Sequence, residues 1–286
     1  MSCLKLSSGR LNLQHYLWRD VLGYNIHPAI PIKNDSDYKI ADVGTGTGIW
    51  LTDIHRQLPS ARLDGFDVST EQYPPKEWLP GNISLKSLDI HKPIPDELRG
   101  VYDLVHVRLL VAVLRDGDLI PVVENLFAML SLYCVLCCLL TWVCEDTLTS
   151  VEPGGYLQWS EINPSTFGIQ SIHPDTRTDE LRYLVESFRL RAPLRWVSEL
   201  PSFFAGQGLK DVLHRSYATP PELLMQMTQI HFMLGEEMSF VIMDNSDPAK
   251  GGPAYRRRIE EAAIEAKEGA AITFACEVTI GMRQVT

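Results

Sequence analysis

The stretch "ADVGTGTGIW", residues 41–50, places three glycines at alternate positions directly behind an acidic residue and an apolar run. We expect a strand to end before this loop and a helix to follow it over residues 47–58. Gly44 would then allow a sharp turn, while Gly46 and Gly48 would leave bare backbone where a Cβ atom would collide with a ligand. A glycine-rich loop between a strand and a helix is typical of nucleotide-cofactor sites. A tight turn that binds nothing is the alternative interpretation.

The form of the glycine loop distinguishes between two ligand classes. A dinucleotide fold favours G-x-G-x-x-G, with the pyrophosphate at the N-terminus of the helix. Here the pattern is G-x-G-x-G, and Ile49 stands where the third dinucleotide glycine would fall. Asp42, just before the first glycine, would repel a pyrophosphate and suits a cationic ligand. S-adenosylmethionine carries an ammonium and a sulfonium and therefore fits by charge, with an NAD-dependent oxidoreductase as the alternative.

Apolar, strand-like runs recur along the chain and are separated by segments long enough for helices. This alternation predicts an α/β fold with a parallel sheet of right-handed βαβ units. Two later runs add two more strands, and helix-like segments at 175–192 and 221–242 could form a lid over the sheet. The expected strands lie within 38–44, 61–69, 83–90, 101–110, 155–162, 208–218 and 270–283.

Acidic residues end the second and third expected strands. Asp67 closes "LDGFD" and could accept hydrogen bonds from both hydroxyls of a ribose, as in dinucleotide sites. Asp89 closes "LKSLD" and could accept from an adenine amino group. A lone aspartate is equally consistent with a solvated strand end or a helix N-cap. Three carboxylates at the ends of three consecutive strands instead indicate a ligand site at the carboxyl edge of the sheet.

Composition narrows the function classes. The 286 residues carry a net charge of −10, which argues against binding nucleic acid through phosphate neutralisation. Six cysteines form no matched pairs with zinc-ligand spacing, so no metal site is expected. The N-terminus has no long apolar core and does not read as a signal peptide. We expect a single domain in a reducing, intracellular and specifically cytoplasmic setting.

Five stretches together resemble one family: "IADVGTGTGIWLTDI", "LDGFDVS", "PPKEWLPGNISLKSLDI", "YDLVHVRLL" and "EPGGYLQWSE". They are similar to the class I S-adenosylmethionine-dependent methyltransferases of fungal secondary-metabolite clusters. The resemblance implies a Rossmann-like, seven-stranded and mostly parallel sheet with the last strand antiparallel, plus a helical lid. It also implies S-adenosylmethionine as cofactor and methyl transfer to N, S or O of a small molecule. A non-catalytic regulator that keeps this fold is a further alternative.

By position, the resemblance assigns a set of residues to the cofactor. They come from the glycine loop, from the ends of the second and third strands, and from the "HVR" segment of the fourth. The set is Asp42, Gly44, Thr45, Gly46, Gly48, Asp67, Val68, Asp89, Ile90, His106 and Val107.

His106 is the candidate catalytic residue. Methyl transfer needs a base only if the acceptor must lose a proton before or during attack. His106, in "YDLVHV", is expected at the same sheet edge as the glycines. It could act as that base, contact the substrate, or form a wall on the adenine side. A structural, hydrogen-bonded histidine is the alternative.

Five further residues are candidate substrate contacts, and three of them have a structural alternative. Arg108 could bind a substrate carboxylate or pair with an internal aspartate. Glu161 could contact the acceptor or fill a packing role. His231 lies on a Met-rich helical face that could be a substrate wall or part of the core. Tyr16 and Trp18, together with the neighbouring His15, could fold over the cofactor as a lid.

Within the single methyltransferase domain, three ranges are expected to build the cover of the site. These are an N-terminal lid helix within 1–34 and two helical lid or substrate elements within 165–207 and 219–252.

The segment 131–151 breaks this pattern. Residues 125–144 carry no charge over about 20 positions, the length of a membrane span. Yet the segment lies between a helix and the strand that this helix should feed. In the family the helix runs almost directly into the "PGG" turn. We interpret 131–151 as translated intron, with a hydrophobic insertion that could contact a membrane and a membrane span as the alternatives.

Overall fold

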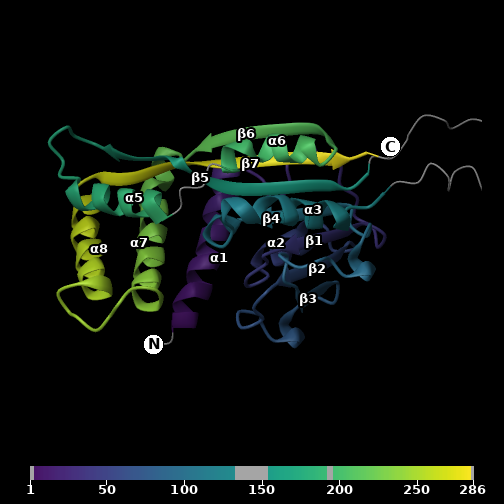
Figure 1. Cartoon of the computed structure of the whole chain (residues 1–286), viewed down its shortest axis with the longest axis horizontal. Helices are drawn as coiled ribbons and strands as arrows, with labels where there is room; N and C mark the ends of the chain where they lie inside the picture. The colour runs from purple at the N-terminus through teal and green to yellow at the C-terminus, as the bar shows by residue number, and fades with distance from the viewer. Residues whose placement is uncertain (1–2, 133–153, 192–195, 285–286) are drawn as a thin grey trace, which may run out of the picture.

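The computed structural model describes residues 3–132, 154–191 and 196–284. Its centre is one seven-stranded sheet with the order β3-β2-β1-β4-β5-β7-β6 (Figure 1). The predicted α/β fold, Rossmann-like with seven strands, is therefore confirmed. The strands are β1 Lys39–Val43, β2 Arg62–Asp67, β3 Ile83–Ser87, β4 Leu104–Arg108, β5 Tyr156–Ser171, β6 Leu209–Ala218 and β7 Ala270–Arg283.

Strands β1 to β5 pair in parallel, and β7 runs antiparallel between β5 and β6. This arrangement is the one that the resemblance implied. Two strand ends differ from the prediction. β3 ends at Ser87, so Asp89 lies two residues beyond the strand. β5 continues to Ser171 rather than ending near residue 162, because it pairs with β7 along a long two-stranded ribbon.

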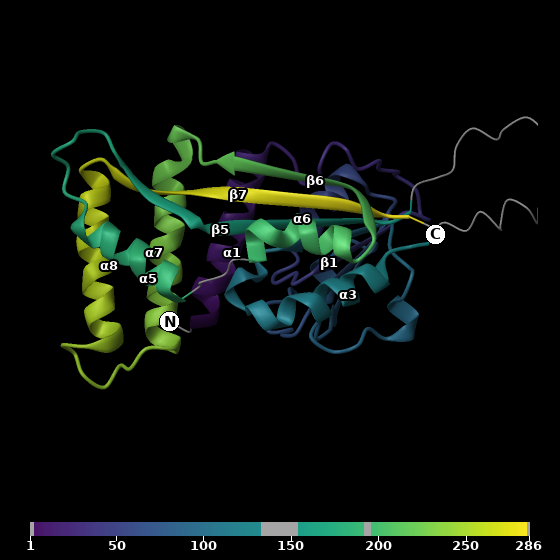
Figure 2. The ribbon, with the colours of Figure 1, turned by 45° about the horizontal axis from the view of Figure 1, so that its top comes forward.

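The helices divide between the sheet and the far end of this ribbon. Figures 1 and 2 show α5, α7 and α8 gathered at that end, away from β1, β2 and β3, with α1 between the two groups. The predicted lid range 219–252 thus contains α7, whereas 165–207 contains part of β5, α5 and α6. The helices are α1 Cys3–Leu22, α2 Ile49–Gln57, α3 Leu119–Met129, α5 Asp179–Arg191, α6 Trp196–Gly206, α7 Leu224–Val241 and α8 Gly251–Lys267.

Alternation along β4 decides which of its side chains can reach the site. Leu104 belongs to the buried cluster that includes residues of α1 and α2. Val105 and Val107 belong to the cluster built with α3 and α6. Side chains two positions apart share one face of a strand, so His106 and Arg108 lie on the side of α1 and α2. Val107 lies on the opposite face.

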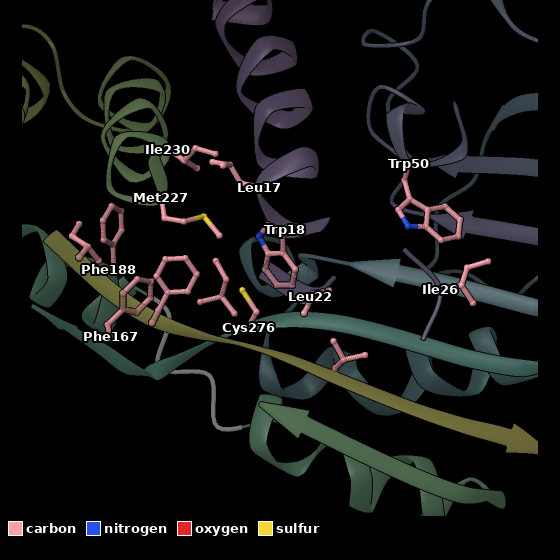
Figure 3. Close-up of a cluster of buried hydrophobic side chains, with 14 of the residues drawn as sticks. Leu17, Trp18, Leu22, Ile26, Trp50, Phe167, Phe188, Met227, Ile230 and Cys276 are labelled. Atoms are coloured by element: carbon pink, nitrogen blue, oxygen red, sulfur yellow. The ribbon is translucent and has the colours of Figure 1, made fainter. Parts of the chain in front are cut away.

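Helix α1 is held in place by burial on its α7 side. Figure 3 shows Leu17 and Trp18 of α1 directed toward the region of Met227 and Ile230 of α7 and Cys276 of β7. All five residues belong to one buried cluster, and Trp18 is only 1% exposed. Burying each large apolar side chain contributes on the order of 1.5–3 kcal/mol. The N-terminal helix is therefore an integral part of the core.

Within the described ranges, no helix is long and apolar enough to cross a membrane. Most of the segment 131–151, which we interpret as translated intron with an insertion or a membrane span as the alternatives, lies outside the described residues.

Candidate functional site

A cavity of about 370 Å³ lies at the carboxyl ends of β1, β2 and β4. Its walls come from α1, the glycine loop, and the loops that follow β2, β3 and β4. It lies where open α/β sheets bind ligands. The residues assigned to the cofactor that line it are Asp42, Gly44, Thr45, Gly46, Asp67, Val68, Asp89, Ile90 and His106. Gly48 and Val107 are not among its lining residues.

The three glycines have backbone conformations that other residues rarely adopt. Gly44, Gly46 and Gly48 have φ angles of 75°, 57° and 75°. A Cβ on Gly46 would lie 3.4 Å from Cδ1 of Leu11, which belongs to α1 above the loop. Gly48 occupies the N-cap of α2, and its Cβ would meet Leu85 of β3 at 3.1 Å. Gly46 thus keeps the loop close to α1, while Gly48 serves the turn and its packing.

Asp42 and His106 form a buried pair between β1 and β4. Nδ1 of His106 lies 2.7 Å from Oδ1 of Asp42, and Thr45 Oγ1 donates to Oδ2 of the same carboxylate at 2.7 Å. The imidazole also stacks on the indole of Trp50, with ring centroids 3.8 Å apart. Since the carboxylate accepts, Nδ1 carries the proton and Nε2 keeps its lone pair. Nε2 has no hydrogen-bond partner among the described residues.

Burial lowers the pKa of His106, and the neighbouring Asp42 carboxylate opposes this effect. A lowered pKa keeps the ring neutral at physiological pH, which agrees with the tautomer that the Asp42 contact selects. The ring can therefore accept a proton at Nε2 from a group in the cavity.

Arg108 brings a positive charge into the same cavity. Its NH2 group donates to Nδ1 of His15 at 2.9 Å, and Nε2 of His15 lies 3.3 Å from Oδ2 of Asp53. Burial, aided by Arg108, lowers the pKa of His15 to about 4. Burial also lowers the pKa of Arg108 to about 10. No carboxylate of the described residues forms an ion pair with Arg108, so the cation has spare donors toward the cavity.

At the other end of the cavity, Asp67 holds the glycine loop. Its Oδ2 accepts from the backbone N–H of Gly46 at 2.9 Å, and its Oδ1 accepts from Ser69 N–H. Asp89 lines the cavity too, but its Oδ1 accepts from the backbone N–H of His91 and its Oδ2 pairs with Lys92 at 3.2 Å. A carboxylate oxygen can accept more than one hydrogen bond, so Asp67 retains capacity for a ligand hydroxyl.

No family model matches the chain. The methyltransferase grgD of Penicillium sp is 28% identical over 265 residues, which cover 88% of this chain and 85% of that protein. The N-methyltransferase tcpN of Claviceps purpurea is 33% identical over 110 residues, or 38% of this chain and 39% of that protein. The secondary metabolism regulator LAE1 of Hypocrea atroviridis is 26% identical over 136 residues, or 47% of this chain and 32% of that protein.

Among solved structures, the fold resembles a protein from Galdieria sulphuraria assigned as a sarcosine dimethylglycine methyltransferase. That match has a TM-score of 0.50 and 13% identity, and it covers 96% of this chain and 87% of the other. Two of these sequence relatives and the structure with a similar fold are named methyltransferases. Together these matches support a class I S-adenosylmethionine-dependent methyltransferase that is similar to methyltransferases of fungal secondary metabolism.

The residues of this methyltransferase fit the cofactor of its class. Gly44 and Gly46 of the loop present bare backbone to the cavity between the strand end and α1. Asp42 is suited to an ammonium and Arg108 to a carboxylate, so the cavity offers both charges that the amino-acid end of the cofactor requires. Asp67 offers acceptor oxygens at the end of β2, the position of ribose contacts in Rossmann-like folds.

Glu161 does not line the cavity of the methyltransferase, but it holds one of its walls. Its buried carboxyl group accepts from the backbone N–H groups of Leu110, Val111 and Ile162 and lies 3.3 Å from Nε1 of Trp159. Burial raises its pKa to about 8, and these donors oppose that rise. Because every partner donates, this contact set stabilises the carboxylate. Glu161 therefore anchors the loop after β4.

Three other predicted substrate contacts also lie away from the cavity. Trp18 is in the core beside α7. His231 is buried, and its Nδ1 lies 2.7 Å from the carbonyl oxygen of Met227 in an aromatic cluster with Phe167, Phe188 and Phe274. Tyr16 packs under the Arg19 guanidinium, 5.1 Å from ring to Cζ. The core alternative describes the position of His231, and neither Trp18 nor Tyr16 lines the cavity.

Sequence reasoning missed several lining residues. Gln14 of α1, Trp50 of α2 and Gln72 after β2 all border the cavity, as does His15, which belongs to the predicted lid. A helical signal was present for part of this set, because Leu11, Gln14 and His15 follow the i, i+3, i+4 spacing of one helix face. No local signal places Gln72 there, since its position depends on how the loop after β2 folds under α1.

Proposed function

We propose that this methyltransferase transfers the methyl group of S-adenosylmethionine to a nitrogen, oxygen or sulfur atom of a small-molecule secondary metabolite. The observation that carries the proposal is the cavity in which Asp42, Asp67 and Arg108 surround the glycine loop. Nitrogen is the favoured acceptor, because tcpN, gliN and verN, which match over 27–38% of this chain, are named N-methyltransferases.

When bound, the cofactor supplies an electrophilic methyl group on a sulfonium. The residues of the chain hold and orient both reactants, and such positioning can supply much of the rate enhancement. His106 adds a place for a proton, since its neutral Nε2 can accept the proton that an acceptor N–H or O–H releases as the bond to the methyl carbon forms. Asp42 then stabilises the imidazolium from the Nδ1 side.

Cofactor binding is tested by calorimetry with S-adenosylhomocysteine and with NAD. We expect S-adenosylhomocysteine to bind and NAD to show no heat of binding. Asp67→Ala should weaken the binding of S-adenosylhomocysteine by about 1–3 kcal/mol, the loss expected for hydrogen bonds to a charged acceptor. Asp96→Ala is the matched control, because the Asp96 side chain is fully exposed. An unchanged affinity in a folded Asp67→Ala variant would remove Asp67 from the site.

A second candidate function is regulation without catalysis, and the match to LAE1 is the observation that favours it. Incubation with methyl-labelled S-adenosylmethionine and a fungal metabolite extract separates the two. An enzyme transfers the label to small molecules that mass spectrometry can identify. A regulator binds the cofactor but leaves the extract unlabelled.

A further inference from the structure

A second hollow of about 380 Å³ lies between α1 and the C-terminal half of α7. We call it the α1–α7 groove. Leu234, Met238, Val241 and Ile242 of α7 and its end form its apolar side, and Ser7, Gln72 and Glu237 add polar groups. Figures 1 and 2 both show the two helices side by side. Val241 and Ile242 are 67% and 61% exposed, so the groove opens at the surface. A hollow of this size suits a small ligand.

Glu237, which lines this groove, has a carboxylate oxygen without a hydrogen-bond partner among the described residues. Its Oε2 accepts from Nε of Arg10 at 3.0 Å and pairs with the NH2 group of Arg10 at 3.0 Å. Its Oε1 is buried and has no hydrogen-bond partner among the described residues. The side chain is only 10% exposed. An unpaired buried carboxylate oxygen costs free energy, and a ligand that donates a hydrogen bond to it would remove that cost.

The groove adjoins the cofactor cavity. Gln72 lines both hollows, and its Nε2 donates to Ser7 Oγ at 3.1 Å. Its Oε1 would lie 3.7 Å from a Cβ on Gly46, so the side chain reaches the glycine loop. Arg10 donates to Gln14 Oε1 at 3.0 Å, and Gln14 lines the cofactor cavity. One polar network thus connects Glu237 to the wall of the cofactor site.

We propose that the α1–α7 groove holds the body of the methyl acceptor, a neutral and largely apolar molecule with an N–H group, separate from the atom that is methylated, that donates to Oε1 of Glu237. This inference rests on the proposed methyltransferase function. The cofactor occupies the cavity with the glycine loop, and the adjoining groove takes the body of the acceptor. Arg10 neutralises the charge of Glu237, which favours a neutral amide or indole N–H over a second cation. The four apolar side chains bind the remainder, and Met238 adapts to its shape.

The first test uses a pair of probes that differ only at the nitrogen: N-(2-naphthylmethyl)acetamide and its N-methyl analogue. Binding is followed by ligand-observed NMR and fluorescence with S-adenosylhomocysteine at saturation, so that the cofactor cavity is filled. We expect the N–H amide to bind at least about 10-fold more tightly than the analogue. Glu237→Gln should weaken binding of the N–H amide about 5- to 10-fold and leave binding of the N-methyl analogue unchanged. Equal binding of the two probes, or no binding of either, would overturn the proposal.

The second test blocks the groove and leaves the Arg10–Glu237 pair intact. Ile242→Trp places a large side chain in the groove, and Ile264→Trp makes the same change at a partly exposed position of α8 outside it. With labelled cofactor and metabolite extract, we expect Ile242→Trp to lower labelled product at least 10-fold and Ile264→Trp to match the unmodified protein. S-adenosylhomocysteine affinity should be unchanged in both variants.

These measurements separate failure of the groove from failure of the proposed function. If the unmodified protein does not bind S-adenosylhomocysteine, the methyltransferase proposal fails. If it binds S-adenosylhomocysteine and labels the extract, but Ile242→Trp has no effect on labelling, the acceptor binds elsewhere and only the groove proposal fails. If the extract remains unlabelled, the probe pair still decides whether the groove binds N–H donors.

Discussion

The imidazole of His106 lies flat against the indole of Trp50, with ring centroids 3.8 Å apart and planes 1° from parallel. The two residues come from β4 and α2, and Oδ1 of Asp42 in β1 lies 2.7 Å from Nδ1 of the imidazole. Three elements of the fold thus fix the orientation of one side chain. A ring held on one face and at one nitrogen leaves Nε2 as its only free polar atom among the described contacts.

This arrangement predicts the effect of His106→Gln. If Nε2 accepts the acceptor's proton, the variant should lose about 10²-fold or more in turnover with little change in cofactor affinity. Burial lowers the pKa of His106, so the acid limb of the rate profile should fall below pH 6.5. Steady-state rates with an identified acceptor and calorimetry with S-adenosylhomocysteine check both points. A near-normal rate would leave positioning as the mechanism and would favour an N or S acceptor that is already nucleophilic.

Buried histidines predict how stability depends on pH. Burial lowers the pKa of His15 and of His231 to about 4, from 6.5 in the unfolded chain. The unfolded state therefore binds more protons between these values, and stability falls as the pH drops from 6.5 toward 4. At pH 5 each histidine should destabilise the fold by on the order of 2 kcal/mol relative to pH 7.5. Urea unfolding at both pH values measures the difference.

His231→Phe tests this assignment, because the side chain lies among Phe167, Phe188 and Phe274 and a further aromatic ring suits that environment. The variant should lose less stability than the unmodified protein between pH 7.5 and pH 5. His173→Phe is the control, since His173 is exposed. If the stability of the His231 variant falls with pH as steeply as that of the unmodified protein, then His231 binds a proton as readily in the folded protein as in the unfolded chain.

The parts of the site that sequence could predict are those encoded by local pattern. The glycine loop, Asp42 and Asp67 all lie at strand ends whose apolar runs are visible in the chain. Two positions differ from the prediction, one for a local reason and one because tertiary packing decides it. Val107 faces the opposite side of β4 from His106, and strand alternation alone could have shown this. Gln72 reaches the cavity through a loop conformation that no local pattern encodes.

The positions of the candidate substrate residues are harder to predict than those of the cofactor residues, because they depend on tertiary packing. Glu161 and His231 are polar residues in apolar surroundings, and sequence cannot distinguish a buried anchor from a ligand contact. Glu161 accepts backbone N–H groups of the loop after β4, and His231 contacts the carbonyl oxygen of Met227 one turn earlier. Glu237 shows the converse, since nothing in its helical context distinguishes it from a solvated surface residue.

Ser131, at the start of the segment 131–151, and Gly155, shortly after its end, meet in the fold. Ser131 N–H donates to the Tyr102 carbonyl at 2.8 Å, and Gly155 N–H donates to the Ser131 carbonyl at 3.1 Å. A Cβ on Gly155 would lie 2.5 Å from the Tyr102 carbonyl oxygen, so this junction is tight. Residues 133–151 themselves lie outside the described part of the chain.

Deleting 131–151 would join Leu130 directly to Glu152, and Glu152 would take the place of Ser131. Its carbonyl would then accept from Gly155 N–H, which closes a β-turn of the sequence Glu152-Pro153-Gly154-Gly155. Proline at the second position and glycine at the third are the pattern of a type II turn. The shorter connection also reduces the entropy cost of closing the loop by on the order of 2 kcal/mol. The deletion therefore restores a compact turn from residues that the chain already contains.

We predict that the deletion variant is more soluble, is at least as stable to heat, and binds S-adenosylmethionine at least as well as the full chain. An uncharged stretch of about 20 residues is an aggregation hazard, and its removal should raise the soluble yield. Thermal unfolding and calorimetry on both proteins measure these effects. Sequencing the transcript tests the intron interpretation independently, because a spliced message would lack these codons. If the transcript retains them and the deletion abolishes folding or cofactor binding, then 131–151 is a structural element of the methyltransferase and the turn at Gly155 depends on it.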